Sequence, residues 1–216
     1  MSPAQRLALA SACAAGFAIS TNYTNHAPLA TVLAATFGFN LAAAGLLTTG
    51  IFLTHAAMQI PGGYLADRIG PKPVIAAAVT LICLANIAIG FAASYQQLLF
   101  WKIFTGLGTG AGFVAGARYI ASMFAGPRLH LAQGLYGGSI LLGSGFVIFA
   151  VPIIFAALGW QSAFLASAVL AAAAGVFWLA APHPPRMKHK PAPLRGMLSS
   201  PQLWLLGLAQ MASFGL

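Results

Sequence analysis

The sequence predicts an all-α membrane protein in which six helices span the bilayer and the beginning of a seventh follows. Composition is the first observation: charged residues make up 5% of the chain and hydrophobic residues 60%, whereas soluble domains are about 25% charged. The second is the length of the apolar stretches, because a spanning helix needs about 20 residues. Their continuity, interrupted by Gly and Pro, favours helices over a membrane barrel. The six stretches are 7–35, 41–65, 74–93, 98–124, 131–158 and 161–181.

The net charge of +9 is unevenly distributed among the loops, which indicates a membrane topology and argues against nucleic-acid binding. Loops at 36–40, 94–97 and 159–161 contain no Lys or Arg. Because cytoplasmic loops are enriched in bases, we expect the N-terminus in the cytoplasm and six crossings of a bacterial inner membrane. Eight of the ten bases lie in the N-terminal tail and in the alternate loops: Arg6, Arg68, Lys72, Arg128, Arg186, Lys188, Lys190 and Arg195.

The first stretch contains a run of polar residues near its middle, from Ser20 to His26, followed by Pro28. Polar groups at this depth need protein partners or a water-filled cavity. Asn22 and His26 are four residues apart and therefore share one helix face. Two interpretations stay open: contact with a solute in a wet cavity, or a hydrogen-bonded cluster that holds helices together.

The second stretch carries a stripe at helical spacing that is expected to face protein rather than lipid. Its members are Thr48, Phe52, His55 and Gln59. His55 is a candidate proton carrier, because an imidazole titrates near neutral pH. The alternative is a packing residue with satisfied hydrogen bonds.

The segment from Gly63 to Lys72 holds the chain's one acidic side chain, Asp67. Gly63 removes a side chain where two helices can cross closely, and Gly70 permits the positive φ of a tight turn. Arg68 and Lys72 place positive charge in a cytoplasmic loop. Asp67 can then pair with a base or face a helix N-terminus, or the segment is only a short polar turn.

The order Gly-x-Leu-Ala-Asp-Arg-x-Gly, followed by a base, resembles the signature loop between the second and third transmembrane helices of Major Facilitator Superfamily (MFS) transporters. The resemblance implies a six-helix bundle of two inverted three-helix repeats, in which the first helix lines a central cavity. Residues of the loop then serve gating: Gly63, Asp67, Arg68, Gly70 and Lys72. Candidate substrate contacts on the first two helices are Asn22, Tyr23, Asn25, His26, His55 and Gln59.

Lys102 lies inside the fourth stretch, where insertion scales assign a Lys a cost of about 2.5 to 3.5 kcal/mol. MFS transporters carry a base at the equivalent place before a Gly-rich segment, and residues 100–110 follow that outline. Lys102 and Thr105 share a helix face and join the candidate substrate site. A substrate anion, an acid from another half of the protein, or carbonyls and water would compensate the charge, unless Lys102 snorkels to the outer interface.

Arg118 lies nearer the cytoplasmic end of the same stretch. It is a candidate latch partner for Asp67, because no other acid is present in the chain. Interfacial snorkelling is the alternative.

Motifs of other function classes are incomplete. Residues 106–111 fit the Gly-x-Gly-x-x-Ala of a dinucleotide loop but lack the acid about 20 residues later. Gly143-Ser144-Gly145 lacks the first Gly of an intramembrane serine protease motif, and five His without convergent carboxylates or paired Cys indicate no metal site. The sequence therefore predicts no enzyme, metal or cofactor. The absence of Gly-Pro-x-x-Gly in the fifth stretch favours symport or uniport over antiport.

A basic, Pro-rich segment after residue 181 marks a domain boundary. We expect a six-helix bundle at 1–181, a cytoplasmic linker at 182–200 and a truncated start of a second bundle at 201–216. A helix from Leu203 to Leu216 would extend about 21 Å, less than the roughly 30 Å of the hydrocarbon core. A C-terminal half is therefore expected to be missing.

The predicted function is secondary active or facilitative transport of a small polar, anionic solute by alternating access, with a proton or another cation as candidate coupling ion. Expected partners are that solute, the lipid bilayer and the missing half, and not nucleic acid. The alternative is a non-transporting membrane module that associates with a partner half or another membrane protein through small-residue helix faces.

Overall fold

A computed structural model of the chain describes residues 1–185, 199–202 and 205. The chain divides into two units, residues 1–186 and 187–216. In the second unit Pro201, Gln202 and Leu205 are helical. The predicted linker at 182–200 and the predicted seventh helix at 201–216 fall largely outside the described residues, so both stay predictions.

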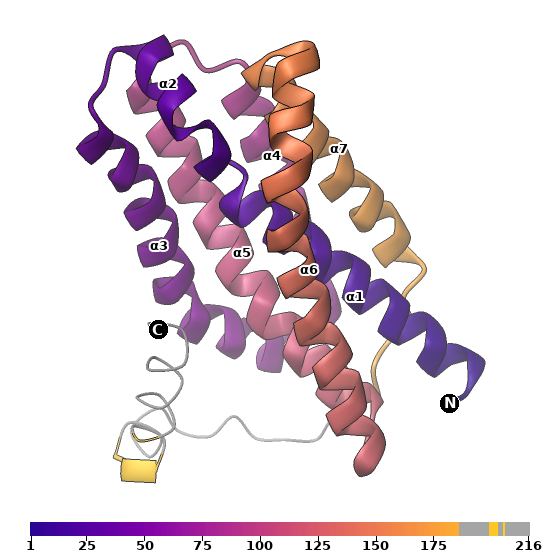
Figure 1. The fold of residues 1–216 in the computed structure, drawn as a ribbon. Coiled ribbons are helices and arrows are strands. Elements are labelled where there is room, and N and C mark those ends of the chain that lie inside the picture. The colour runs from indigo at the N-terminus through magenta and orange to yellow at the C-terminus, as the bar shows by residue number, and fades with distance from the viewer. Residues whose placement is uncertain (186–198, 203–204, 206–216) are drawn as a thin grey trace. The chain divides into compact units, whose positions relative to one another are not determined.

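The first unit is a bundle of long helices without a strand among residues 1–185, which confirms the predicted all-α class (Figure 1). Five of its helices, α3 to α7, are long and apolar enough to cross a membrane. Together they make an integral, multi-pass membrane protein. The elements are α1 (Pro3–Thr24), η1 (Ala27–Leu29), α2 (Ala30–Phe37), α3 (Leu41–Arg68), α4 (Pro71–Gly90), α5 (Tyr95–Met123), α6 (Pro127–Leu158) and α7 (Trp160–Leu179).

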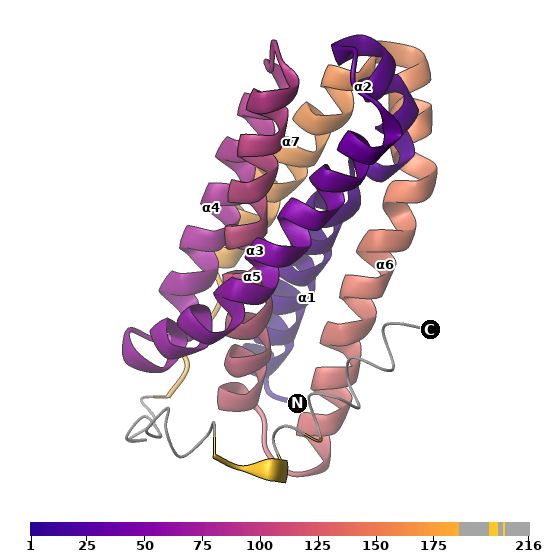
Figure 2. The ribbon, with the colours of Figure 1, turned by 90° about the vertical axis from the view of Figure 1, so that its left-hand side faces the viewer.

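The first predicted span, residues 7–35, is a broken element rather than one continuous helix. α1 ends at Thr24, a 3-10 turn covers Ala27–Leu29, and α2 continues to the upper end of the bundle in both views (Figures 1 and 2). Pro28 lies inside the turn and has no backbone N–H to donate, so the helix cannot continue through it unchanged. The break leaves the last carbonyl groups of α1 without helical partners inside the bundle.

The long helices form two sets of three that interleave. The first set is α1, α3 and α4, and the second is α5, α6 and α7. The most extensive contacts join helices of different sets: α3 with α5, α4 with α5, α1 with α6 and α4 with α7. Each helix therefore packs mainly on the other set, as expected when two inverted repeats build one bundle.

Glycines on α5 let this helix approach its neighbours closely. A Cβ on Gly106 would collide with the side chain of Thr54 and the carbonyl oxygen of Ile51, and one on Gly110 would collide with the carbonyl oxygen of His55. Contact at this range between small residues is the usual way in which membrane helices pack. It brings the middle of α3 against the middle of α5.

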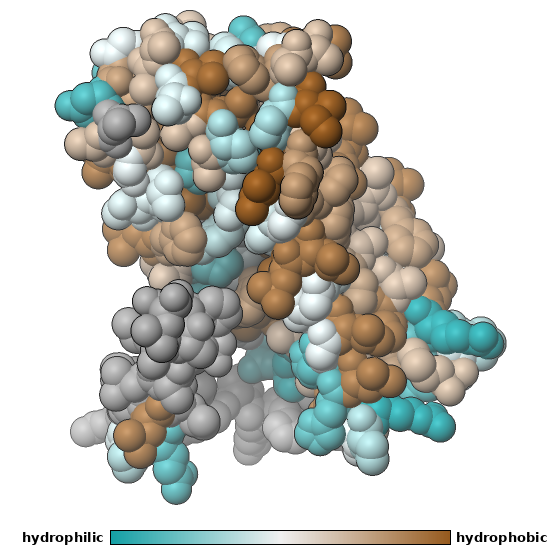
Figure 3. Space-filling view, in the orientation of Figure 1, coloured by the Kyte–Doolittle hydropathy of each residue, from teal (hydrophilic) through white to brown (hydrophobic). Residues whose placement is uncertain are grey.

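The N-terminus, the α3–α4 turn and the α5–α6 turn lie at the same end of the bundle (Figure 1). Hydrophilic residues gather at this end, at the beginnings of α1 and α6, whereas the side of the bundle above them is largely apolar (Figure 3). Gly70 has a φ of +95° immediately before α4, so the predicted positive-φ turn is present.

Candidate solute-binding site

A partly exposed cluster of aromatic and polar side chains lies where the middles of α3 and α5 meet the end of α1. We call it the His55 patch and define it as Tyr23, His55, Gln59, Thr109 and Phe113. Thr109 is buried and the other four side chains are half-buried. The Tyr23 ring lies 4.9 Å from the His55 ring, and the Phe113 ring lies 5.8 Å from it on the other helix. Because His55 is near the middle of α3 (Leu41–Arg68), the patch lies partway along this helix.

Hydrogen bonds in the patch assign His55 a neutral tautomer with its proton on Nδ1. The Thr109 hydroxyl donates its single proton to the Gly106 carbonyl oxygen at 3.1 Å. It must therefore accept at its other contact, 3.1 Å from His55 Nδ1. His55 Nε2 then accepts from the Gln59 amide nitrogen at 3.1 Å. The Gln59 side-chain oxygen and the Tyr23 hydroxyl make no hydrogen bond with the residues described, so both can serve a solute.

Lys102 lies seven residues before Thr109 on α5 and is fully buried. Its ammonium donates to the Asn25 side-chain oxygen at 2.5 Å and to the Asn22 carbonyl oxygen at 3.3 Å. The ammonium also lies 5.4 Å from the centre of the Phe164 ring on α7, within the range of a cation–π contact. All of these partners are uncharged. Lys102 does not snorkel to the interface, which removes that alternative.

The polar run of the first span packs inside the bundle. Asn22 donates to the carbonyl oxygens of Ala18 and Ser167, at 2.7 and 3.3 Å, and so links α1 to α7. His26 Nε2 lies 3.0 Å from the Thr48 hydroxyl on α3. Asn22, Asn25 and His26 are at most 3% exposed. The hydrogen-bonded cluster foreseen as one alternative therefore exists at these residues.

The eight predicted substrate contacts thus divide into two groups. Tyr23, His55 and Gln59 come together on the partly exposed patch. The other five are buried inside the bundle, among them Thr105, whose hydroxyl donates to the Trp101 carbonyl oxygen within its own helix. Their direct contact with a solute stays a prediction.

Sequence reasoning missed Asn86, a fully buried amide on α4 whose oxygen accepts from the Asn25 side chain at 2.9 Å. The available signal was a single amide within an otherwise apolar stretch. It also missed Phe164, which nothing in the sequence distinguishes from other aromatic packing residues.

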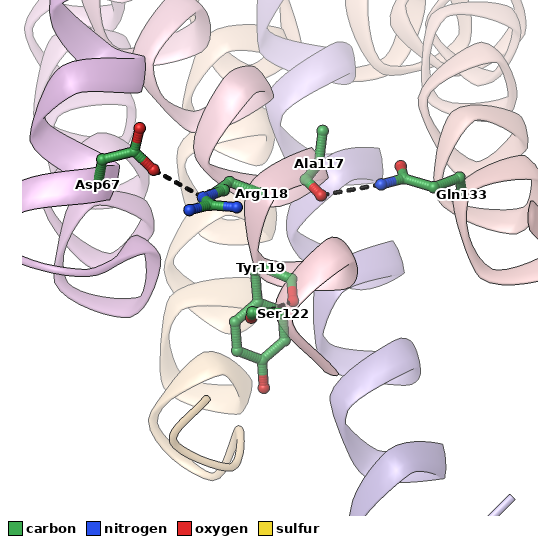
Figure 4. Close-up of polar contacts among 6 residues, drawn as sticks. All are labelled: Asp67, Ala117, Arg118, Tyr119, Ser122 and Gln133. Carbon is green, nitrogen blue, oxygen red and sulfur yellow. Dashed lines mark hydrogen bonds and ion pairs between the residues drawn. The ribbon is translucent and has the colours of Figure 1, made fainter. Parts of the chain in front are cut away.

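The predicted gating loop forms a definite contact at the N-terminal end of the bundle. Arg118 Nε donates to Asp67 Oδ1 at 2.7 Å, so the expected ion pair is present, and its gating role stays a prediction (Figure 4). The end of α5 around this pair is held by further bonds, including one from Gln133 on α6 to the Ala117 carbonyl oxygen at 2.9 Å (Figure 4). Arg68 is exposed.

Two other members of the loop, Lys72 and Gly63, have contacts that the sequence did not indicate. The Lys72 ammonium donates to the carbonyl oxygens of Leu179 and Ala181, and therefore caps the C-terminal end of α7. The close helix crossing occurs at Gly62 and not at Gly63: a Cβ on Gly62 would lie 2.8 Å from the Ala111 backbone, whereas one on Gly63 would make an ordinary contact at 3.4 Å.

Comparison with known proteins finds similarity to membrane transporters. Two curated relatives are a probable sulfoacetate transporter of Cupriavidus necator, 31% identical over 59% of this chain and 30% of that protein, and a nitrate/nitrite transporter of Picosynechococcus sp., 28% identical over 80% of this chain and 38% of that protein. A crystal structure of a bacterial homolog of the human lysosomal transporter Spinster, inward-facing and unoccupied, has the same fold, with a TM-score of 0.75 at 20% identity over 91% of this chain and 48% of that one.

The chain therefore spans half or less of the length of each of these proteins. The sequence profile of the Major Facilitator Superfamily matches residues 12–216, nearly the whole chain. Together with the multi-pass helical fold, this match shows that the chain belongs to the Major Facilitator Superfamily, a family of membrane transporters and not of enzymes.

Proposed function

We propose that this chain forms part of a carrier that moves a small anionic solute across a bacterial inner membrane by alternating access. The observation that carries the proposal is the buried Lys102 cation, which has only neutral partners. Asp67, the one acid of the chain, is engaged with Arg118 instead. In this proposal Lys102 carries its proton, and its charge has no carboxylate partner among the described residues.

The His55 patch is the proposed contact surface for the solute. The Tyr23 hydroxyl and the second N–H of the Gln59 amide, the one not directed to His55, offer hydrogen-bond donors to an anion. Thr109 is seven residues after Lys102 on α5, so their backbone positions are about 10 Å apart along the helix axis, and we take this as the scale of the separation between the charge and the patch. At an effective dielectric constant of about 20, a monovalent anion at the patch gains about 1.6 kcal/mol, or roughly tenfold in affinity.

In this proposal the charge of Lys102 attracts the solute electrostatically. The remaining predicted contacts form the buried polar cluster near it: Asn22, Asn25, His26 and Thr105. The two curated relatives support an anionic solute, because each is named as a transporter of an anion: sulfoacetate for one, and nitrate or nitrite for the other. Symport or uniport stays the proposed transport class.

His55 is the proposed site for a coupling proton. Its Nε2 atom accepts from the Gln59 amide nitrogen. A proton on Nε2 would bring two donors face to face, so the Gln59 amide would have to rotate and present its oxygen. Such a rotation changes the donors that the patch offers to a solute.

Uptake by proteoliposomes tests the proposal, with the protein expressed from its native gene and with nitrate, sulfoacetate and uncharged urea as probes. We expect saturable uptake of an anion, competition among anions and no competition by urea. Saturable uptake of a cation, with no binding of either anion, would contradict the proposed solute class.

The alternative function, a non-transporting module that docks another membrane segment, draws on the open face of α6. A Cβ on any of four glycines of this helix would meet nothing within 4 Å: Gly134, Gly137, Gly138 and Gly145. Stable co-purification with a partner protein, without uptake of any solute, would favour this alternative.

A further inference from the structure

Asn86 is a polar side chain that the proposed transport site does not use. It lies in the apolar helix α4, and its side chain is fully buried. No solute at the His55 patch can touch it. A buried amide in a membrane helix is costly unless both its donor and its acceptor groups are paired.

The hydrogen bonds of Asn86 have a fixed direction. Its amide nitrogen donates to the Ile82 carbonyl oxygen at 2.9 Å, and a carbonyl can only accept. The Asn86 oxygen is therefore turned toward Asn25, where it accepts from the Asn25 amide nitrogen at 2.9 Å. This bond in turn directs the Asn25 oxygen to the Lys102 ammonium, which donates to it at 2.5 Å.

We propose that Asn86 is a positioning residue that acts on the solute through Asn25 and Lys102. The series Ile82 carbonyl, Asn86, Asn25 and Lys102, here called the amide relay, connects α4, the broken end of α1 and α5. Its role in solute affinity rests on the proposed anion transport, whereas its effect on Lys102 does not.

The relay matters because the Asn25 amide has two possible orientations with opposite effects. With its oxygen toward Lys102, the amide dipole stabilises the cation. With its nitrogen toward Lys102, two donors meet and the cation loses its closest acceptor. Asn86 and Lys102 both favour the first orientation, since Asn86 accepts from the Asn25 nitrogen and Lys102 donates to the Asn25 oxygen. Without Asn86, the buried Asn25 nitrogen loses its acceptor, so Asn25 is held less firmly against Lys102 and the ammonium is less well solvated.

The test is a double-mutant cycle of four proteins: the native protein, Asn86→Leu, Lys102→Met and the double variant, each expressed from the native gene. One readout is the melting temperature in mild detergent. The other is the half-saturation concentration and maximal rate of nitrate and sulfoacetate uptake in proteoliposomes. Ser167→Ala is the matched control, because Ser167 is a buried polar side chain that bonds only within its own helix, to Ala163.

We expect Asn86→Leu to lower the melting temperature by about 5 °C in the native background and much less in the Lys102→Met background. Asn86→Leu should also raise the half-saturation concentration for the anion several-fold with little change in maximal rate, and should have no further effect once Lys102 is absent. Ser167→Ala should leave that concentration unchanged.

Additive effects of the two substitutions on melting and on half-saturation would overturn the relay. If Asn86→Leu fails to accumulate, accumulation of the double variant is the supporting result, and failure of both overturns the proposal. Coupled melting in a protein that transports no anion would support the relay and remove the proposed function instead.

Discussion

Removal of the charge on Lys102 is expected to weaken anion binding about tenfold. Lys102→Gln keeps a polar side chain that can still donate to Asn25, but it removes the positive charge. The estimate follows from the separation of Lys102 and Thr109 along α5, about 10 Å, and an effective dielectric constant of about 20. At 1.36 kcal/mol per factor of ten, the lost attraction of about 1.6 kcal/mol corresponds to a roughly tenfold higher dissociation constant.

Arg128→Gln supplies a control for the change in net charge. Arg128 lies at the beginning of α6 and is exposed, so its charge is screened by water. We expect this variant to bind anions like the native protein. The measurement is anion binding or half-saturated uptake at two ionic strengths, because the effect of a buried charge persists in salt whereas that of an exposed charge does not.

Equal anion affinity in Lys102→Gln and the native protein, at equal abundance, would refute the electrostatic reasoning. Lys102 would then be a structural residue that only closes the break in the first span. A natural solute with a positive charge would refute it as well.

Three further predictions concern other parts of the bundle. Asp67→Asn should lower uptake more than it lowers protein abundance. The side chains of the Arg118–Asp67 pair are 29 and 40% exposed, so the pair contributes at most about 1 kcal/mol to stability and its loss should leave abundance nearly unchanged. Normal uptake would count against a gating role. Gly110→Ala should reduce thermal stability, at a typical cost of about 1 to 3 kcal/mol, because the new methyl group would collide with the His55 carbonyl oxygen. Gly145→Ala should not reduce it, because a Cβ at Gly145 meets nothing within 4 Å. Equal melting temperatures of the two variants would contradict this packing. Cysteine labelling should reach Lys72, Arg128 and Lys190 from the cytoplasmic side, and Gln97 and Gly159 from the outside. Labelling of residue 190 from the outside would exclude six crossings.

Local signals in the sequence were sufficient for the helices and for the turn after α3. Long apolar stretches define α3 to α7 because a membrane offers no partners to an irregular backbone. Gly70 could be assigned a positive φ because only glycine adopts it at low cost. These features depend on neighbours in sequence, and sequence patterns report such features well.

The neighbour that each helix face meets could not be predicted from periodicity. Helical spacing placed Lys102 and Thr105 on one face of α5, but it could not show that the broken end of α1 closes over that face. For the same reason Asn86 was overlooked, since its partner is 61 residues away in sequence. The extent of the break was not predictable either, because Pro28 predicts a kink and not the loss of helix from Asn25 to His26.

The break in the first span explains how a buried lysine can remain without an acid. α1 ends at Thr24, so its carbonyl end, which carries a partial negative charge, terminates inside the bundle, and Lys102 donates to a carbonyl near that end. A carboxylate partner would have neutralised Lys102 and would compete with an arriving anion. The helix end supplies only partial charge, so it stabilises the cation and leaves most of its field for a solute. A continuous helix through residues 25 to 29 would engage these carbonyls in its own hydrogen bonds. The end of α1 and the Asn25 side chain therefore solvate Lys102 together without a carboxylate.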